Sequence, residues 1–202
     1  MFVISACSPK RLYDSDYYCQ KFRFNCIRDN KIVSFKTSKG NFDVKLFGSD
    51  NPVTVTNFIF NIKKNIYSNQ KFYKIIDFPQ LKVIHSGIKS INNQNIDKNS
   101  FSDIIHPQIP LEIKFKQDIE PKYNFQIKDP FDSRNLTNIF ESGSIAMIKK
   151  GKKSSSSTEF FFVTNKIPEL DGRYSVFGKV VKGFEVLEKI DKSDFIYEIT
   201  LN

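Results

Sequence analysis

The 202-residue chain contains no tryptophan, two methionines, two histidines and three cysteines. Its eight glycines and eight prolines are too few for a fibrous or low-complexity protein. The cysteines and histidines follow no metal-ligand spacing such as CxxC or HExxH, so the sequence predicts neither a metal site nor a cofactor. No apolar run is long enough to span a bilayer. What is present is the composition of one ordinary globular domain.

Positive charge is in excess, with 31 lysines and arginines against 22 aspartates and glutamates and a formal net charge of +9. Such an excess is compatible with nucleic acid, acidic lipid or acidic protein partners. The lysines are scattered, however, through a chain rich in asparagine and isoleucine, and no nucleic-acid-binding motif accompanies them. We therefore expect no nucleic-acid partner, and we expect the lysine and serine run at 149–157 to form a solvated loop.

The first thirty residues are polar and aromatic without a regular pattern. They predict an N-terminal extension or tether, residues 1–30, before a domain at 31–202. Cys19 and Cys26 in this segment either close a short disulfide loop in an oxidising compartment or remain two unrelated free thiols.

The segment Ile4-Ser5-Ala6-Cys7 resembles the lipobox of bacterial lipoproteins, in which the cysteine carries a lipid anchor. Only six residues precede Cys7, fewer than a signal peptide needs, so either the true start lies upstream of Met1 or the match is accidental. In the first case the protein is periplasmic or lipid-anchored in the cell envelope, with this lipid as its only link to a membrane. In the second case it is cytoplasmic.

Hydrophobic periodicity predicts a mainly β domain. Phe42, Val44 and Leu46 alternate with polar residues, which is typical of a strand with one buried face. After the helix-start signal Asn51-Pro52, apolar residues at helical spacing predict an amphipathic helix over 52–64. Together these patterns indicate a closed eight-stranded antiparallel β-barrel with two capping helices. Further strands are expected at 72–76, 81–84, 109–113, 143–147, 160–163, 176–181 and 197–201, a short helix at 184–190, and long loops at 88–108 and 116–138.

Three ordered groups of residues carry a family resemblance. They are Lys39–Phe47 with Asn51–Phe58, then Phe72-Tyr73-Lys74-Ile75-Ile76, and finally Gly143–Met147 with Ser157–Thr164 and Leu170–Val180. In this order and spacing, roughly residues 31–201 resemble a cyclophilin-type peptidyl-prolyl cis-trans isomerase of the bacterial style. The resemblance implies a barrel with a groove for proline-containing polypeptides on its outer face, and a monomeric enzyme that assists protein folding.

The resemblance also implies a catalytic cation. In the family an arginine holds the prolyl amide, and its position falls here on Lys74. Lysine keeps the charge and a donor but lacks the planar fork of arginine. The glutamine that bonds the substrate backbone becomes Glu159, whose carboxylate could pair with Lys74 and weaken its action.

Other residues are assigned to substrate binding by the same resemblance. Phe161 corresponds to the floor of the proline pocket, His85 stands in place of a glutamine, and Tyr174 stands in place of a histidine. The turn Asp77–Lys82 is longer than the turn that the family has there. The full set of expected substrate-binding residues is Phe72, Val83, His85, Met147, Glu159, Phe161, Leu170 and Tyr174.

Two functions are therefore compatible with the sequence. The first is isomerisation of Xaa-Pro bonds, and the alternative is a non-catalytic module or chaperone that only holds proline-containing segments. Lys74 and Glu159 discriminate between them, because an unpaired lysine favours catalysis and a lysine held by Glu159 favours binding alone.

Overall fold

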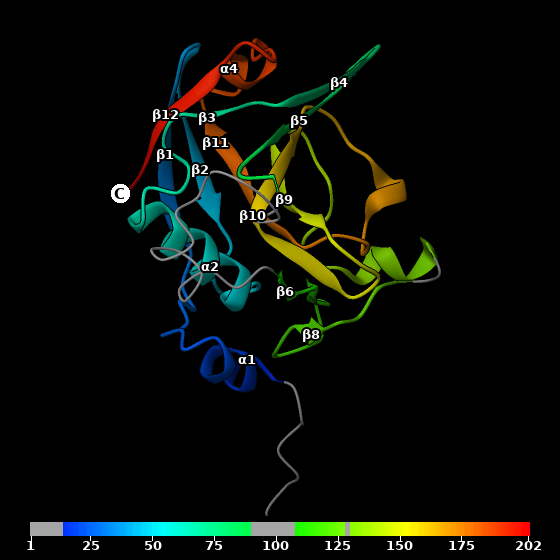
Figure 1. The fold of residues 1–202 in the computed structure, drawn as a ribbon. Coiled ribbons are helices and arrows are strands. Elements are labelled where there is room, and N and C mark those ends of the chain that lie inside the picture. Colours follow the sequence, from blue (N-terminus) through cyan, green and yellow to red (C-terminus); the bar gives the residue numbers. More distant parts are fainter. Residues whose placement is uncertain (1–13, 90–107, 128–129) are drawn as a thin grey trace, which may run out of the picture.

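The computed structural model describes residues 14–89, 108–127 and 130–202, and Figure 1 shows their arrangement. Within these ranges no helix is both long and apolar enough to cross a membrane. The helices are α1 (Ser15–Lys21), α2 (Pro52–Lys63) and α4 (Phe184–Glu188), with 3-10 turns at Pro130–Asn135 and Pro168–Leu170. The strands are β1 (Lys31–Thr37), β2 (Gly40–Leu46), β3 (Gln70–Lys71), β4 (Lys74–Phe78), β5 (Leu81–Ser86), β6 (Gln108–Pro110), β7 (Glu112–Ile113), β8 (Lys122–Tyr123), β9 (Ser144–Lys149), β10 (Ser154–Val163), β11 (Val176–Lys182) and β12 (Phe195–Leu201).

Most of the strands form one strongly curled antiparallel sheet, which confirms the mainly β fold (Figure 1). Its order is β3-β12-β1-β2-β11-β9-β10-β5-β4, and β6 pairs with β10. This is a ten-stranded sheet rather than the expected eight, because short β3 and β6 add to the long strands. No ladder joins the edge strands β3 and β4 within the described chain. The chain itself links β3 to β4 through Phe72-Tyr73. The hydroxyl of Ser86, at the end of β5, also donates to the Lys71 carbonyl of β3 at 3.2 Å.

Helix α2 closes one side of the curled sheet, as the helical spacing predicted. Its apolar stripe, including Phe58 and Ile62, packs into the main core. Two buried amides on the same helix, Asn57 and Asn61, donate to the Ser157 carbonyl of β10 at 2.6 and 2.7 Å. Helix α4 contributes Leu187 to the same core. We call this the inner core, and its strand residues include Val33, Phe35, Phe42, Val44, Leu46, Ile84, Ile145, Met147, Phe160, Phe162 and Phe177.

Strand β10 separates the inner core from the outer face. Phe160 and Phe162 point into the inner core, whereas Phe161 and Val163 join a second cluster on the opposite side. The expectation that the lysine and serine run forms a solvated loop is wrong for the second half of the run, because Ser155–Ser157 are buried within β10. Pairing of β6 with Ser154–Ser156 covers this part of the strand.

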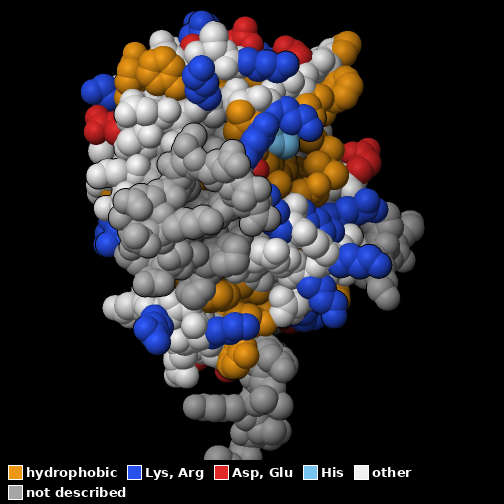
Figure 2. Space-filling view, in the orientation of Figure 1, with side chains coloured by type: hydrophobic (Ala, Val, Ile, Leu, Met, Phe, Trp, Pro, Cys, Tyr) orange, Lys and Arg blue, Asp and Glu red, His pale blue; other side chains and the backbone are white. Residues whose placement is uncertain are grey.

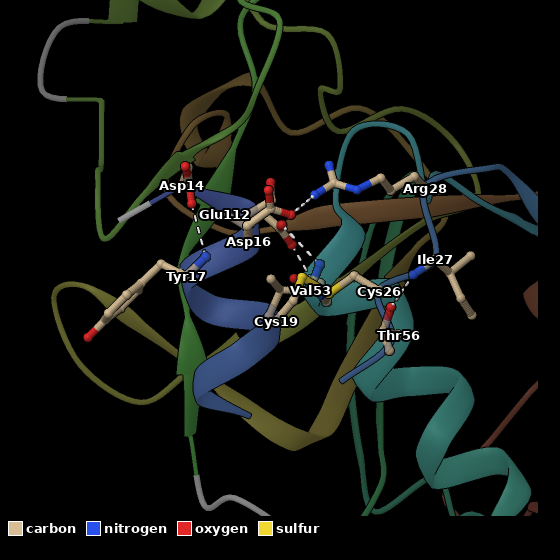
Figure 3. The surroundings of a disulfide bond; sticks show 12 residues. Asp14, Asp16, Tyr17, Cys19, Cys26, Ile27, Arg28, Val53, Thr56 and Glu112 are labelled. Atoms are coloured by element: carbon tan, nitrogen blue, oxygen red, sulfur yellow. Dashed lines mark hydrogen bonds and ion pairs between the residues drawn. A yellow bond between two sulfur atoms is a disulfide. The ribbon is translucent and has the colours of Figure 1, made fainter. Parts of the chain in front are cut away.

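The segment expected to be an irregular tether is ordered from residue 14 onward. It forms α1 and a disulfide between Cys19 and Cys26, with their Cα atoms 5.8 Å apart (Figure 3). Tyr18 and Phe22 pack with Val53 at the start of α2. The Ile27 amide donates to the Thr56 hydroxyl at 2.8 Å. Residues 14–30 are therefore anchored on α2. Cys7 lies outside the described residues.

A buried carboxylate holds the N-terminus of α2. Glu112 of β7 is 1% exposed and accepts hydrogen bonds from the amides of Val53 (3.1 Å) and Thr54 (2.9 Å), and from the Tyr123 hydroxyl (2.7 Å). Figure 3 shows Glu112 next to Val53 and the disulfide. The side chain of Asn51, the N-cap residue, makes no capping bond, so Glu112 satisfies donors that a local cap normally satisfies. Burial raises the pKa of Glu112, and these hydrogen bonds oppose that shift.

Candidate active site

The strand register places the predicted catalytic lysine in one row with the predicted pocket. Lys74 of β4 lies opposite His85 of β5, and His85 lies opposite Phe161 of β10. Phe161 in turn lies opposite Ala146 of β9, which lies opposite Val176 of β11. Side chains of directly opposed residues project from the same face of a sheet. The row therefore runs across the outer face from an exposed lysine to a buried apolar cluster.

The apolar part of this face is a defined cluster, here called the outer cluster. The His85 ring stacks on Phe161 with centroids 5.5 Å apart, and Tyr174 meets Phe161 edge-on at 5.3 Å. Phe161 itself is 3% exposed, and half-buried side chains pack around it. Figure 2 shows hydrophobic side chains gathered on one side of the visible face, bordered by lysine and arginine side chains. The outer cluster contains Phe140, Ala146, Phe161, Val163 and Val176, with Leu81, Val83, Ile148, Ile167, Leu170 and Tyr174 packed against it.

His85 is a neutral imidazole at physiological pH. Burial, together with the nearby Lys74 and Lys89 charges, lowers its pKa to about 4, while Glu159 acts in the opposite direction. A neutral imidazole has one N–H donor and one acceptor nitrogen. The side-chain amide of the glutamine that it replaces likewise has both a donor and an acceptor. His85 can therefore bond a peptide backbone without adding charge to the groove.

Glu159 has partners other than Lys74. Its carboxylate, on a residue 5% exposed, forms an ion pair with Lys150 and accepts hydrogen bonds from the hydroxyls of Tyr73 (3.0 Å) and Ser156 (3.4 Å). Burial and the neighbouring Glu159 charge raise the pKa of Tyr73, so its hydroxyl remains a donor. The side-chain ammonium of Lys74 makes no ion pair or hydrogen bond with the rest of the described chain, although the Lys74 backbone belongs to the β4–β5 ladder. The pairing of Glu159 with Lys74 that the sequence left open is therefore absent among these residues.

Two of the expected substrate-binding residues do not face the groove. Met147 and Phe72 are both 0% exposed and belong to the inner core. Met147 lies opposite Phe160, so both side chains point inward, and the alternation of β9 turns Ala146 and Ile148 outward instead. Phe72 sits between the two edge strands, where its amide donates to the Asp194 carbonyl at 3.0 Å. Their side chains therefore lie away from the outer face, a placement that does not favour direct contact with substrate, and that contact stays a prediction.

The remaining expected residues lie together. Val83, Leu170 and Tyr174 all border the outer cluster around Phe161, and their contact with substrate stays a prediction. Sequence reasoning missed Ile148 and Phe140. The period of two in β9 could have found Ile148. No local pattern identifies Phe140, whose amide donates at 2.7 Å to the carboxylate of Asp171, 31 positions away in the chain.

A sequence model of the family described as "Cyclophilin type peptidyl-prolyl cis-trans isomerase/CLD" matches residues 32–199. The chain is a cyclophilin. It is 26% identical over 166 residues to a peptidyl-prolyl cis-trans isomerase of Acinetobacter baylyi, covering 80% of this chain and 72% of that protein. It is 25% identical over 172 residues to a peptidyl-prolyl cis-trans isomerase of Helicobacter pylori, covering 84% and 86% of the two chains. This cyclophilin spans a smaller share, 28%, of the isomerase-like protein 2 of Rhizopus delemar.

Solved cyclophilins share the fold. A cyclophilin-type isomerase of Cryptosporidium parvum superimposes with a TM-score of 0.56 at 22% identity, covering 86% of this chain and 98% of that chain. The same Cryptosporidium protein solved in the presence of the dipeptide Ala-Pro gives a TM-score of 0.55 at 20% identity, covering 85% and 99%. The cyclophilin family acts on proline-containing peptides, and its enzymatic activity is peptidyl-prolyl cis-trans isomerisation.

Proposed function

We propose that this cyclophilin isomerises Xaa-Pro bonds with the proline ring over Phe161 and with Lys74 as the cation that acts on the prolyl amide. The observation that carries the proposal is the cross-strand row, which ends in an exposed lysine beside His85 and Phe161. Proline-containing segments of unfolded or partly folded polypeptides are the proposed substrates.

The reaction requires rotation about a bond with partial double-bond character and a barrier of about 20 kcal/mol. No covalent intermediate is needed, because a site that binds the twisted amide better than either planar isomer lowers this barrier. The lone pair of the proline nitrogen is released as resonance breaks, and a hydrogen bond from the Lys74 ammonium stabilises it there. The outer cluster holds the ring and excludes water from the rotating bond.

Lysine differs from arginine in how it performs this step. Its ammonium is a compact charge on a flexible stem and cannot hold two acceptors in a fixed plane. His85, stacked on Phe161 and neutral, is placed to take over part of the backbone positioning. We therefore expect a working but slower enzyme, whose rate depends on the Lys74 charge.

Prolyl exchange measured by NMR in a short Ala-Pro peptide tests the proposal. Wild type should accelerate exchange, and Lys74→Ala should lose at least about tenfold of the acceleration, as removal of a transition-state donor does. Lys74→Arg should retain or increase it. Lys45→Ala on β2, another exposed strand lysine, is the matched control and should behave as wild type. Peptide binding without acceleration in wild type would favour the non-catalytic alternative, and unchanged turnover in Lys74→Ala would exclude the lysine from catalysis.

We further propose that the protein works in an oxidising compartment of the cell envelope. The Cys19–Cys26 disulfide supports this proposal, since such bonds persist mainly outside the reducing cytosol. Rapid alkylation of thiols in intact cells, followed by mass spectrometry of the 19–26 peptide, tests it. Oxidised cysteines in the envelope fraction support the proposal, and two alkylated thiols in the cytosolic fraction contradict it. Mass spectrometry of the peptide that contains Cys7 reports separately whether this cysteine carries a lipid.

A further inference from the structure

A cavity lies beyond the outer cluster, where the long turn between β4 and β5 meets the end of β10 and α4. Its volume is about 420 Å³. Its apolar lining comes from Phe78, Leu81 and Phe184, and Phe78 is 57% exposed at the tip of the hairpin. A cavity of this size is sufficient for one large side chain. The turn that forms this cavity is Asp77–Lys82, which is longer than the corresponding turn in the family.

The cavity walls are held in place by hydrogen bonds. The Lys82 amide donates to the Thr164 hydroxyl at 2.8 Å, and the Thr164 amide donates to the Lys82 carbonyl at 3.0 Å. The Asn165 side-chain amide donates to the Gln80 carbonyl at 3.1 Å. These bonds fasten the hairpin tip to the end of β10, so the cavity is formed before anything binds in it.

The cation in the lining is already paired. The Lys82 ammonium donates to the Glu188 carbonyl at 2.7 Å and lies 3.7 Å from the Asp77 carboxylate. An ionic ligand would have to compete with these partners. The apolar surface offered to a ligand is the exposed Phe78 ring with Leu81 and Phe184, and the rest of the lining is polar, including Gln80, Ser142, Thr164 and Asn165.

The cavity adjoins the outer cluster through one shared residue. Leu81 lines the cavity and also packs against the outer cluster, two residues before Val83 on the same face of β5. Two residues of strand span about 7 Å. Phe161 lies opposite His85, and Leu81 lies four residues, about 13 Å, before His85 on β5. An extended polypeptide rises by about 3.3 Å per residue, so a side chain about four positions from a proline over Phe161 reaches this cavity.

We infer that this cavity is a second substrate subsite, which takes a large apolar side chain, aromatic by preference, about four residues from the isomerised proline. The inference rests on the proposed function for the position of the proline. The occupant is the substrate polypeptide itself, because the cavity shares Leu81 with the groove that binds it. The long β4–β5 turn then selects substrates by sequence as well as by proline content.

Peptide binding measured by titration calorimetry tests the subsite. The peptides carry one proline in an alanine and glycine background, with Phe either four residues before or four residues after it, and are compared with the all-Ala version. One of the two Phe peptides should bind wild type about tenfold tighter than the all-Ala peptide, a difference of about 1.4 kcal/mol. This preference should disappear in Phe78→Ala and persist in Tyr197→Ala, a control that removes another exposed aromatic ring from β12.

Each result has a defined meaning. Equal binding of all peptides to wild type, or a preference that survives in Phe78→Ala, overturns the subsite. Self-association of wild type that Phe78→Ala abolishes also overturns it, since the occupant is then a second copy. Exchange of a short Ala-Pro peptide, too short to reach Phe78, reports the proposed function separately and should be unchanged in Phe78→Ala. A Phe preference without catalysis of the short peptide would support the subsite while removing the isomerase assignment.

Discussion

Removal of the Glu112 carboxylate should destabilise the domain more than removal of any exposed acidic residue. Glu112 accepts hydrogen bonds from two amides at the start of α2 and from the Tyr123 hydroxyl, at 2.7 to 3.1 Å. Glu112→Ala leaves the two amides without their acceptor in a site where the side chain was 1% exposed, whereas the Tyr123 hydroxyl can still donate to the Ser15 hydroxyl oxygen at 2.7 Å. A buried donor left unsatisfied costs about 1–3 kcal/mol, and hydrogen bonds to water that enters the vacated volume offset part of this cost. We therefore expect a loss of about 3–5 kcal/mol, a large share of the 5–15 kcal/mol typical of a domain.

The assay is urea unfolding followed by circular dichroism, because the chain has no tryptophan to report by fluorescence. Glu112→Gln keeps a carbonyl acceptor and should lose about 1–2 kcal/mol, less than the alanine variant. Glu198→Ala, which removes a 51% exposed partner of Lys36, is the matched control and should change stability by less than about 1 kcal/mol. If Glu112→Ala unfolds at the same urea concentration as Glu198→Ala, the proposed capping role of Glu112 is wrong.

Two further predictions concern the disulfide and His85. The double variant Cys19→Ala/Cys26→Ala, or reduction of the wild type, should lower the free energy of unfolding of residues 14–30 by about 2–3 kcal/mol, because the disulfide closes a loop with a sequence separation of 7. Hydrogen exchange at the amides of α1 measures this change, and unchanged protection would contradict the prediction. His85 has a folded-state pKa of about 4 against an ordinary value of 6.5, so its contribution to stability is complete above pH 6.5 and is lost as pH falls toward 4. After allowance for the exposed part of the ring, this loss should be about 1–2 kcal/mol. Urea midpoints of wild type and His85→Gln across this range measure it, and parallel pH profiles would refute the assignment.

The periodic elements were predictable because each has a local signal. Asn51-Pro52 and the apolar spacing after it located α2 to within one residue of its end. Alternation in β10 assigned Phe161 to the face opposite Phe160 and Phe162, as observed. The same period of two, applied to β9, would have assigned Met147 to the inner core, but the residue was placed by family motif instead. The family motif identified the strand that contains Met147. The pleat of that strand decides which of its residues lie on the outer face, and these are Ala146 and Ile148.

The N-terminal segment has no comparable signal. Tyr18 and Phe22 belong to a short helix whose apolar side is satisfied by Val53, more than thirty positions away in the chain. A helix of this length is not stable alone, and its formation depends on tertiary packing. The sequence therefore suggested a tether, although the two cysteines that close the disulfide were visible in it.

By itself the sequence determined the mainly β class, the main strands, the amphipathic helix, the family, and Lys74, His85 and Phe161 as candidates for one site. Only the tertiary structure decided that these three side chains form one row, because register between strands joins residues that are distant in the chain. It also decided the partners of Glu159, which are Lys150, Tyr73 and Ser156 rather than Lys74. Charge pairing depends on distances of a few ångströms between segments, and a linear pattern of residue types does not contain those distances.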